Sequence, residues 1–294
     1  MAGPLRRVGI LEMAGADPLR LSLWQVFRHR LQEAGWIEGE SIDFDFRWAD
    51  GHEDRLANAA AELVRSNVDV LVTTGTPAAD LASRATLTLP IVMATGTAPD
   101  AARANVAGVI DLPPGLSARR LALLHEAVPD AVCLAVLLDG ANSSSPRAIE
   151  EAGQAARALG VVLKDYWVKG PDRFNETFAA IAKGGAGGVS LGPGAMFFAR
   201  RSVLAALAAD YRLPSMAGRK EYVEAGGLMS YGSPIRDNYR RAAVYVDRIL
   251  RGADPADLPA EAPTEYELVI NRKVAGKLGV AVSDGLLRQA TFVV

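Results

Sequence analysis

Short apolar runs alternate with amphipathic stretches along most of this chain, and the runs are rich in β-branched and aliphatic residues. Strand-length runs separated by helix-length segments are typical of β-α-β crossovers, which give parallel sheets covered on both faces by helices. We therefore predict an α/β fold with parallel sheets. The predicted strands lie at 7–11, 42–46, 68–72, 90–94, 132–138, 161–167 and 189–191.

Two stretches, 27–75 and 150–192, follow one plan. Each has a helix ending in a small turn, a strand, a loop with Asp-Arg and an apolar residue, a second helix, and a strand that runs into Gly. The loop motif is 54–56 in the first copy and 172–174 in the second. A repeat of one βαβα unit predicts two similar lobes rather than a solenoid. Two such lobes would form a cleft between them, where small ligands commonly bind.

Later breaks in the pattern suggest where the chain crosses between the lobes. Pro113-Pro114-Gly115 interrupts the first set of elements, and a long helix is predicted from Ser233-Pro234 to Leu250. A proline-rich strap follows at 253–264, between strands predicted at 228–231 and 266–270. From these breaks we predict an N-terminal lobe of 5–113 plus 226–256 and a C-terminal lobe of 114–225 plus 257–294.

Composition narrows the classes of ligand and partner. The 294 residues suffice for about two domains, and a net charge of −2 provides no basic field for nucleic acid or anionic lipid. We expect a neutral or zwitterionic small molecule and no nucleic-acid partner. The single cysteine, Cys133, is predicted to be a buried strand thiol. No stretch reaches the roughly 18–20 apolar residues of a membrane span, and no export signal is recognised, which leaves periplasmic and cytoplasmic locations open.

Catalytic motifs are weak in this sequence. The segment 188–192 fits G-x-S-x-G, but an α/β-hydrolase places its histidine after the nucleophile, whereas His29, His52 and His125 all precede Ser190. The three histidines are scattered without metal-ligand spacing, and we predict that they lie at the surface. No P-loop or complete dinucleotide fingerprint occurs. We therefore predict no catalytic residue, metal or cofactor.

The loops that leave the carboxyl ends of the predicted strands hold the candidate binding residues, because ligands bind at that edge of open α/β sheets. In the loop 73–78, hydroxyls and free N–H groups at a helix start suit a carboxylate, although Thr76 is equally explained as a plain N-cap. The loops 95–97, 139–144 and 192–194 are small or polar. They would let a ligand approach the backbone, and they are also ordinary turn sequences.

Several segments resemble the ABC-transporter substrate-binding proteins known for tryptophan- and tyrosine-type substrates. The most specific is Glu-Tyr-Val-Glu-Ala-Gly-Gly-Leu-Met-Ser-Tyr-Gly at 221–232, and further similar segments are 35–39, 47–49, 75–79, 239–247, 252–259 and 267–271. The resemblance covers nearly the whole chain. It implies a type I periplasmic-binding-protein fold with two Rossmann-like lobes that close on a ligand. It also implies solute capture for an ABC importer without catalysis, a permease as partner, and a monomer.

Two departures from the family pattern concern the ligand. After Ala94 the family usually has Gly or Ser, then Asp-Pro and a longer glycine-rich loop, whereas this chain has Thr-Gly-Thr-Ala-Pro at 95–99. At the corresponding strand exit of the second lobe, Gly192-Pro193 replaces the family's Asp-Pro. The ligand therefore lacks an ammonium group, or Glu12, Asp139 or Glu221 supplies the missing charge. An amino acid is our first expectation, followed by an aromatic acid or other small carboxylate.

The predicted ligand-binding residues come from these loops and from the resemblance. They are Glu12, Met13, Thr74, Gly75, Thr76, Pro77, Thr95, Gly96, Asn142, Ser143, Gly192, Pro193, Arg219, Glu221 and Tyr231. Two alternatives to the importer component stay open: a cytoplasmic small-molecule sensor of the same fold, and a serine hydrolase that uses Ser190.

Overall fold

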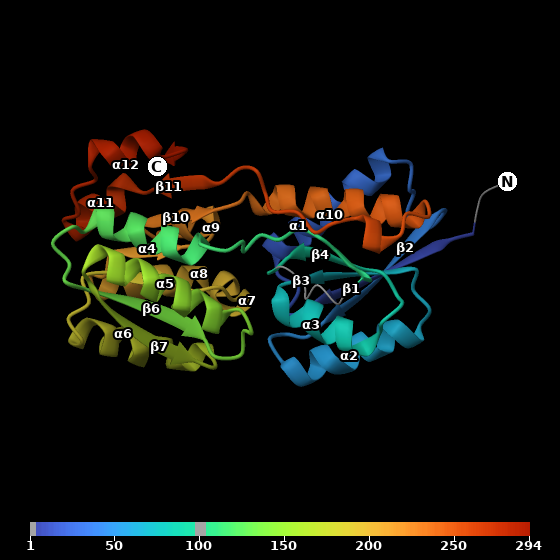
Figure 1. The fold of residues 1–294 in the computed structure, drawn as a ribbon, viewed down its shortest axis with the longest axis horizontal. Helices are drawn as coiled ribbons and strands as arrows, with labels where there is room; N and C mark the ends of the chain where they lie inside the picture. Colours follow the sequence, from blue (N-terminus) through green and yellow to red (C-terminus); the bar gives the residue numbers. More distant parts are fainter. Residues whose placement is uncertain (1–3, 98–103) are drawn as a thin grey trace. The chain divides into compact units, whose positions relative to one another are not determined.

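The computed structural model describes residues 4–97 and 104–294, and the chain divides into two compact units (Figure 1). Unit 1 consists of Met1–Pro113 and Ile235–Thr264, and unit 2 of Pro114–Pro234 and Glu265–Val294. The first crossing lies where the sequence placed it, after residue 113. The other two differ from the expected boundaries, which put 226–234 in the first lobe and 257–264 in the second.

Strand pairing explains both differences. Strand β10 (Met229–Gly232) pairs with β9 (Ser215–Ala217) on one side and with β11 (Glu267–Ile270) on the other, so it belongs to the sheet of unit 2. In the proline-rich strap, Glu261 forms a β-bridge with Val109 of unit 1. The sequence pattern identified the strand and the strap but not their partners.

Unit 1 contains a five-stranded parallel sheet in the order β2-β1-β3-β4-β5. Its elements are β1 (Arg6–Glu12), α1 (Pro18–Glu33), β2 (Ile42–Trp48), α2 (Glu53–Arg65), β3 (Val70–Thr74), α3 (Thr76–Ala85), β4 (Ile91–Thr95), β5 (Val106–Gly108), α10 (Ile235–Leu250) and the 3₁₀ turn η2 (Pro255–Asp257). Helix α1 begins where the Asp17 carboxylate accepts the Arg20 backbone N–H (2.9 Å) and Pro18 takes the first helical position.

Helix α10 completes unit 1, although it lies far from the rest of the unit in sequence. Figure 1 shows it in orange against the blue α1. The indole of Trp24 makes edge contacts with Tyr239 of α10 and with Phe27, at centroid distances of 4.9 and 5.4 Å. All three side chains are at most 1% exposed. These aromatic contacts pack α10 against α1.

Unit 2 contains a seven-stranded sheet in the order β12-β11-β10-β9-β8-β6-β7. Strand β11 runs antiparallel to β10, while the other pairs are parallel. The remaining elements of the unit are α4 (Leu116–Ala127), β6 (Cys133–Asp139), α5 (Ser145–Leu159), β7 (Val162–Val168), η1 (Pro171–Arg173), α6 (Phe174–Lys183), β8 (Val189–Leu191), α7 (Ala195–Ala199), α8 (Arg201–Asp210), α9 (Lys220–Glu224), α11 (Arg272–Leu278), α12 (Asp284–Gln289) and β12 (Phe292–Val293).

The sequence repeat corresponds to equivalent halves of the two sheets. The first copy folds as α1-β2-α2-β3 and the second as α5-β7-α6-β8. In unit 1 the strand before the repeat, β1, lies between β2 and β3, and in unit 2 β6 lies between β7 and β8. The two units therefore begin with the same doubly wound arrangement.

Strand β6 shows how the unit 2 sheet is covered. All seven of its residues are buried. Leu134, Val136 and Leu138 belong to one hydrophobic cluster, while Cys133, Ala135 and Leu137 belong to the other. Because side chains alternate between the faces of a strand, helices must cover both faces here. Cys133 is 8% exposed, as expected for a strand thiol.

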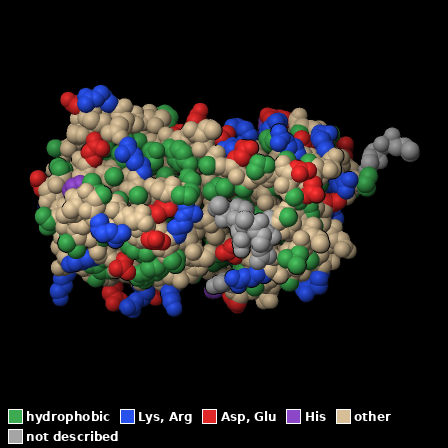
Figure 2. Space-filling view, viewed as in Figure 1, with side chains coloured by type: hydrophobic (Ala, Val, Ile, Leu, Met, Phe, Trp, Pro, Cys, Tyr) green, Lys and Arg blue, Asp and Glu red, His purple; other side chains and the backbone are tan. Residues whose placement is uncertain are grey.

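Charge and hydropathy at the surface match an ordinary globular chain. On the face shown in Figure 2, lysine and arginine side chains are interspersed with aspartate and glutamate. Within residues 4–97 and 104–294, no helix combines the length and the apolar character needed to cross a bilayer.

Tyr222 of α9 should make unit 2 sensitive to alkali. Burial raises the pKa of its phenol well above the usual value, although its hydrogen bond to Ser215 Oγ (2.7 Å) acts in the opposite direction. Above about pH 10 the unfolded chain loses this proton and the folded protein keeps it. The free energy of unfolding should therefore fall with rising pH, by up to about 1.4 kcal/mol per pH unit for this group.

Urea denaturation between neutral pH and pH 11 measures this effect. Tyr222→Phe should remove its share of the alkaline decline, at a loss of about 1 kcal/mol at pH 7. Ser215→Ala removes the hydrogen bond and keeps the buried phenol, so the decline should remain. An identical alkaline decline in Tyr222→Phe and the parent protein would contradict the prediction.

Candidate functional site

The carboxyl edge of unit 1, where β1, β3 and β4 end, brings together the residues that the sequence predicted for the first lobe. The Thr74 hydroxyl donates a hydrogen bond to Glu12 Oε1 (2.6 Å), and the Gly75 N–H donates to Thr95 Oγ1 (2.9 Å). The residues at this edge are Glu12, Met13, Thr74, Gly75, Thr76, Pro77, Thr95 and Gly96. They gather because parallel strands end on the same side of a sheet.

Glu12 is neutralised within unit 1. The carboxylate is 0% exposed, and its Oε1 accepts from Arg20 Nη1 at 2.7 Å. Burial opposes the charge on Arg20, but attraction by Glu12, Tyr239 and Asp17 together with the hydrogen bond to Glu12 outweighs it, and the pKa of Arg20 is raised. No motif in the sequence distinguishes Arg20, which lies in the first turn of α1 and was not among the predicted site residues. Because the two opposite charges compensate each other, Glu12 adds no net negative charge to this edge.

A small polar network joins the start of α3, the residues that follow β4, and Asp111 after β5. Thr76 Oγ1 accepts from the Thr97 N–H (3.1 Å), and the Gly96 N–H donates to the buried Asp111 Oδ1 (2.6 Å). Gly75, with φ of +79°, is the N-cap of α3, so Thr76 is the first helical residue rather than the cap. Hydroxyls and N–H donors at a helix start suit an anionic group such as a carboxylate. The Ala98-Pro99 part of the predicted loop lies outside the described residues.

The carboxyl edge of unit 2, where β6, β8, β9 and β10 end, holds the other predicted residues. These are Asn142 and Ser143 after β6, Gly192 and Pro193 after β8, Arg219 and Glu221 after β9, and Tyr231 near the end of β10. Asn142 Oδ1 accepts the Ser144 N–H (2.9 Å), which shapes the turn before α5. The two loop sets thus occupy equivalent edges of the two sheets.

Asp139, the last residue of β6, is a buried carboxylate at this edge. It is 7% exposed, and burial raises its pKa, while the Ala141 N–H donated to Oδ1 (3.0 Å) lowers it. Gly194 lies against the other oxygen: a Cβ atom at Gly194 would be 3.0 Å from Oδ2. The sequence named Asp139 as a possible source of charge but did not include it among the binding residues.

Arg219, Glu221 and Tyr231 have structural partners of their own. Arg219 Nη1 donates to the Ser233 carbonyl (2.8 Å). Burial raises the pKa of Glu221, whereas its own backbone N–H and then Arg219 lower it. The Tyr231 ring stacks on Tyr266 at 5.8 Å.

Arg120, which was not among the predicted site residues either, donates from Nε to the Tyr231 carbonyl (2.8 Å). Burial lowers its pKa to about 10. It supports the backbone at the end of β10 from the α4 side.

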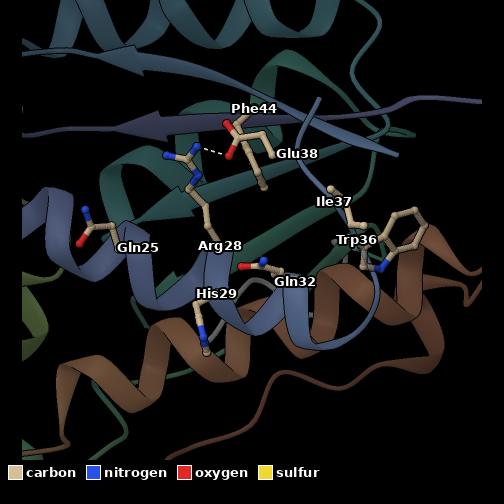
Figure 3. Close-up of a pocket in the computed structure, with 8 residues that line it drawn as sticks. All are labelled: Gln25, Arg28, His29, Gln32, Trp36, Ile37, Glu38 and Phe44. Carbon is tan, nitrogen blue, oxygen red and sulfur yellow. Dashed lines mark hydrogen bonds and ion pairs between the residues drawn. The ribbon is translucent and has the colours of Figure 1, made fainter. Parts of the chain in front are cut away.

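A separate open pocket of about 340 Å³ lies on unit 1 beside α1 and β2. Figure 3 shows Arg28 paired with Glu38 there, with Trp36 and Ile37 on the α1–β2 connection. That connection precedes β2, so it lies at the amino edge of the parallel sheet, opposite the Glu12 edge. None of the predicted binding residues lines this pocket.

The geometry around Ser190 does not match a nucleophile elbow. Ser190 lies inside β8, is 6% exposed, and pairs with Val136 on one side and Met216 on the other. A nucleophile elbow needs its serine on a sharp strand-to-helix turn. His29 and His52 are exposed, while His125 is partly buried, contrary to the expectation that it lies at the surface. Among residues 4–97 and 104–294, no group of three His, Cys, Asp or Glu side chains is placed to hold a metal ion.

Comparison with known proteins gives consistent results over the whole chain. Residues 8–294 match the family model described as ABC transporter substrate binding protein. The chain is 21% identical to a protein named tyrosine-binding protein from Clostridioides difficile (strain R20291), over 83% of this chain and 73% of that protein.

Two solved structures share the fold closely. One, described as the ABC domain in complex with L-Trp from Streptococcus pneumonia, is 23% identical with a TM-score of 0.89 and covers 99% of this chain and 100% of its own. The other, a conserved domain protein from Vibrio cholerae O1 biovar eltor, is 24% identical with a TM-score of 0.90, covering 98% and 99%. The predicted type I periplasmic-binding-protein fold is confirmed. The chain belongs to the ABC transporter substrate-binding protein family.

Proposed function

We propose that this protein is the solute-binding component of an ABC importer and that it captures an amino acid in the periplasm for a permease, acting as a monomer without catalysis. The observation that carries the proposal is the family match over residues 8–294. A relative named tyrosine-binding protein and a structural neighbour described in complex with L-Trp support an amino acid as the ligand. A small carboxylate without an amine is the second candidate for the ligand.

The chemistry of the two carboxyl edges supports this proposal. The unit 1 edge offers the α3 start with the Thr76 and Thr97 hydroxyls, which suit a carboxylate. The unit 2 edge offers the polar turn at Asn142 and the side chain of Arg219. In this proposal the ligand contacts residues of both units and is held as the lobes close on it. Closure then requires more ligand contacts in the closed state than in the open one.

Single alanine variants at the two edges test the proposed site. We expect a loss of about 1–3 kcal/mol in ligand binding for each of Thr76→Ala, Asn142→Ala and Arg219→Ala, because each variant would lose a buried hydrogen bond or charge contact with the ligand. Isothermal titration calorimetry measures the loss, after a thermal-shift screen of the twenty amino acids and related carboxylates has found the ligand. Ligand at 100 times its dissociation constant should add about 2.7 kcal/mol of stability.

Thr177→Ala is the matched control, since Thr177 is a partly exposed threonine of α6 whose hydroxyl donates to the carbonyl of Arg173, the residue before that helix. Its affinity should equal that of the parent protein. Unchanged affinity in all three edge variants would rule out the proposed site. The importer role is tested separately by uptake of the labelled ligand in cells lacking the gene: undiminished uptake would favour the sensor alternative.

A further inference from the structure

We propose that Asp139 recognises the ammonium group of the ligand, so that the protein selects amino acids over carboxylates that lack an amine. This inference rests on the proposed function and assigns the charge recognition within that site to one side chain. Four carboxylates are buried: Glu12, Asp111, Asp139 and Glu221. Asp111 accepts the Gly96 N–H within unit 1, and the surroundings of the other three, which the sequence named as sources of charge, distinguish them.

Glu12 is unsuited to bind a ligand cation. It is fully buried, and the guanidinium of Arg20 already binds its Oε1 at 2.7 Å. The Thr74 hydroxyl binds the same oxygen at 2.6 Å. A second cation at Glu12 would have to share a charge that is already compensated, close to a fixed positive group.

Glu221 is also a poor candidate. Its Oε2 is inaccessible to solvent and has no hydrogen-bond partner, so a ligand could reach this carboxylate only at Oε1. Burial raises the pKa of Glu221, and the adjacent positive charges of Arg219 and Lys220 oppose that rise. An ammonium group placed here would be repelled by both.

Asp139 differs from both in having no cation of its own. No Lys, Arg or His nitrogen in the described part of the chain forms an ion pair with it, and the Lys169 stem that passes Gly140 makes none. Its Oδ1 accepts the Ala141 N–H (3.0 Å), and Oδ2 faces Gly194. Burying an uncompensated carboxylate is costly, and such groups are found where a ligand supplies the missing charge.

The loop after β8 packs closely against Asp139 at Gly194. A Cβ at Gly194 would lie 3.0 Å from Oδ2 and 3.2 Å from the Asp139 Cβ, which is closer than almost any side chain approaches. The φ of 163° at Gly194 is extended and open to any residue, so close approach rather than backbone conformation favours glycine here. An ammonium group reaching Oδ2 would form a charge-assisted hydrogen bond.

The experiment compares an amino acid with its des-amino analogue in the parent protein and in Asp139→Asn. Titration calorimetry would use L-tyrosine and L-tryptophan, each paired with 3-(4-hydroxyphenyl)propionate or indole-3-propionate. The parent protein should prefer the amino acid by at least 50-fold. Asp139→Asn keeps an acceptor for the Ala141 N–H but lacks the negative charge. Compared with the parent protein, this variant should bind the amino acid at least 50-fold more weakly. Its affinity for the des-amino analogue should not be lower than that of the parent.

The free protein supplies a second readout. Because burial raises the pKa of Asp139, ionising it destabilises the folded state at neutral pH. Asp139→Asn should therefore melt at a higher temperature than the parent protein when no ligand is present. A residue with a merely structural role would give the opposite shift. Asp130→Asn, at an exposed carboxylate of unit 2, is the control and should change neither property.

Gly194→Ala provides an independent variant, because it fills the space at Oδ2 and keeps the charge. It should weaken amino-acid binding at least tenfold, whereas Gly276→Ala, where a Cβ would meet open space, should not. If the parent protein binds amino acids but Asp139→Asn binds them equally well, the assignment of Asp139 is wrong and the proposed function stands. If the parent binds none of the four probes and no other amino acid, the proposed function itself fails, and this inference with it.

Discussion

Replacing Arg20 by methionine should lower the free energy of unfolding by about 3–5 kcal/mol, because the change leaves the Glu12 carboxylate buried without its cation. Glu12 and Arg20 are 0% and 5% exposed, and the 2.7 Å bond between them is out of reach of water. The hydroxyl of Thr74 cannot replace a positive charge. Urea denaturation followed by circular dichroism measures the loss.

A double variant separates the loss of a favourable pair from the burial of a lone charge. Glu12→Gln combined with Arg20→Met removes both charges, so it should recover much of the stability lost in Arg20→Met alone. The pair Arg173–Glu176 has the same chemistry at 3.0 Å, but its side chains are 60% and 66% exposed. Arg173→Met should therefore cost less than about 1 kcal/mol. Equal losses at the buried and the exposed pair would contradict this account.

The sequence predicted the positions of the site loops better than the roles of the side chains within them. Loops such as 73–78 could be placed at one edge because the strand pattern predicts a parallel sheet, and parallel strands end on one side. Arg20 could not be linked to Glu12 in the same way. Its side chain reaches the end of β1 through the packing of α1, and no local pattern reports that approach.

Short elements were missed for a related reason. Strands β5 and β9 have three residues each, too few to show the two-residue alternation that identifies a strand, and unlike the equally short β8 they lie outside the sequence repeat. They form because neighbouring strands offer unpaired backbone groups: Ile91, Val92 and Met93 pair with β5, and β10 and β8 flank β9. The second crossing between the units was predicted before residue 226, but it lies after residue 234. It was predicted too early because β10 pairs with β9 of unit 2, and β9 was not predicted.

Replacing Gly108 by alanine should destabilise the protein by roughly 2–6 kcal/mol, the sum of backbone strain and overpacking. Gly108 ends β5 with φ of +123°, which L-residues rarely adopt. A Cβ atom there would lie 2.2 Å from the Met93 carbonyl oxygen and 2.6 Å from the Met93 nitrogen. Both atoms belong to the backbone of β4, so no side chain can turn aside to relieve the clash.

Gly252→Ala isolates the contribution of the backbone angle. Gly252 follows α10 with φ of +100°, but a Cβ there would meet nothing within 4 Å. Its replacement should cost only about 1–2 kcal/mol. The difference between the two variants, measured by urea denaturation, reports the clash with Met93 alone. Equal losses would show that β5 shifts away from β4 without penalty. A larger loss at Gly108 would show that β5 is held in place against β4. The neighbouring Val109 would then be fixed as well, and with it the β-bridge to Glu261 that joins the strap to unit 1.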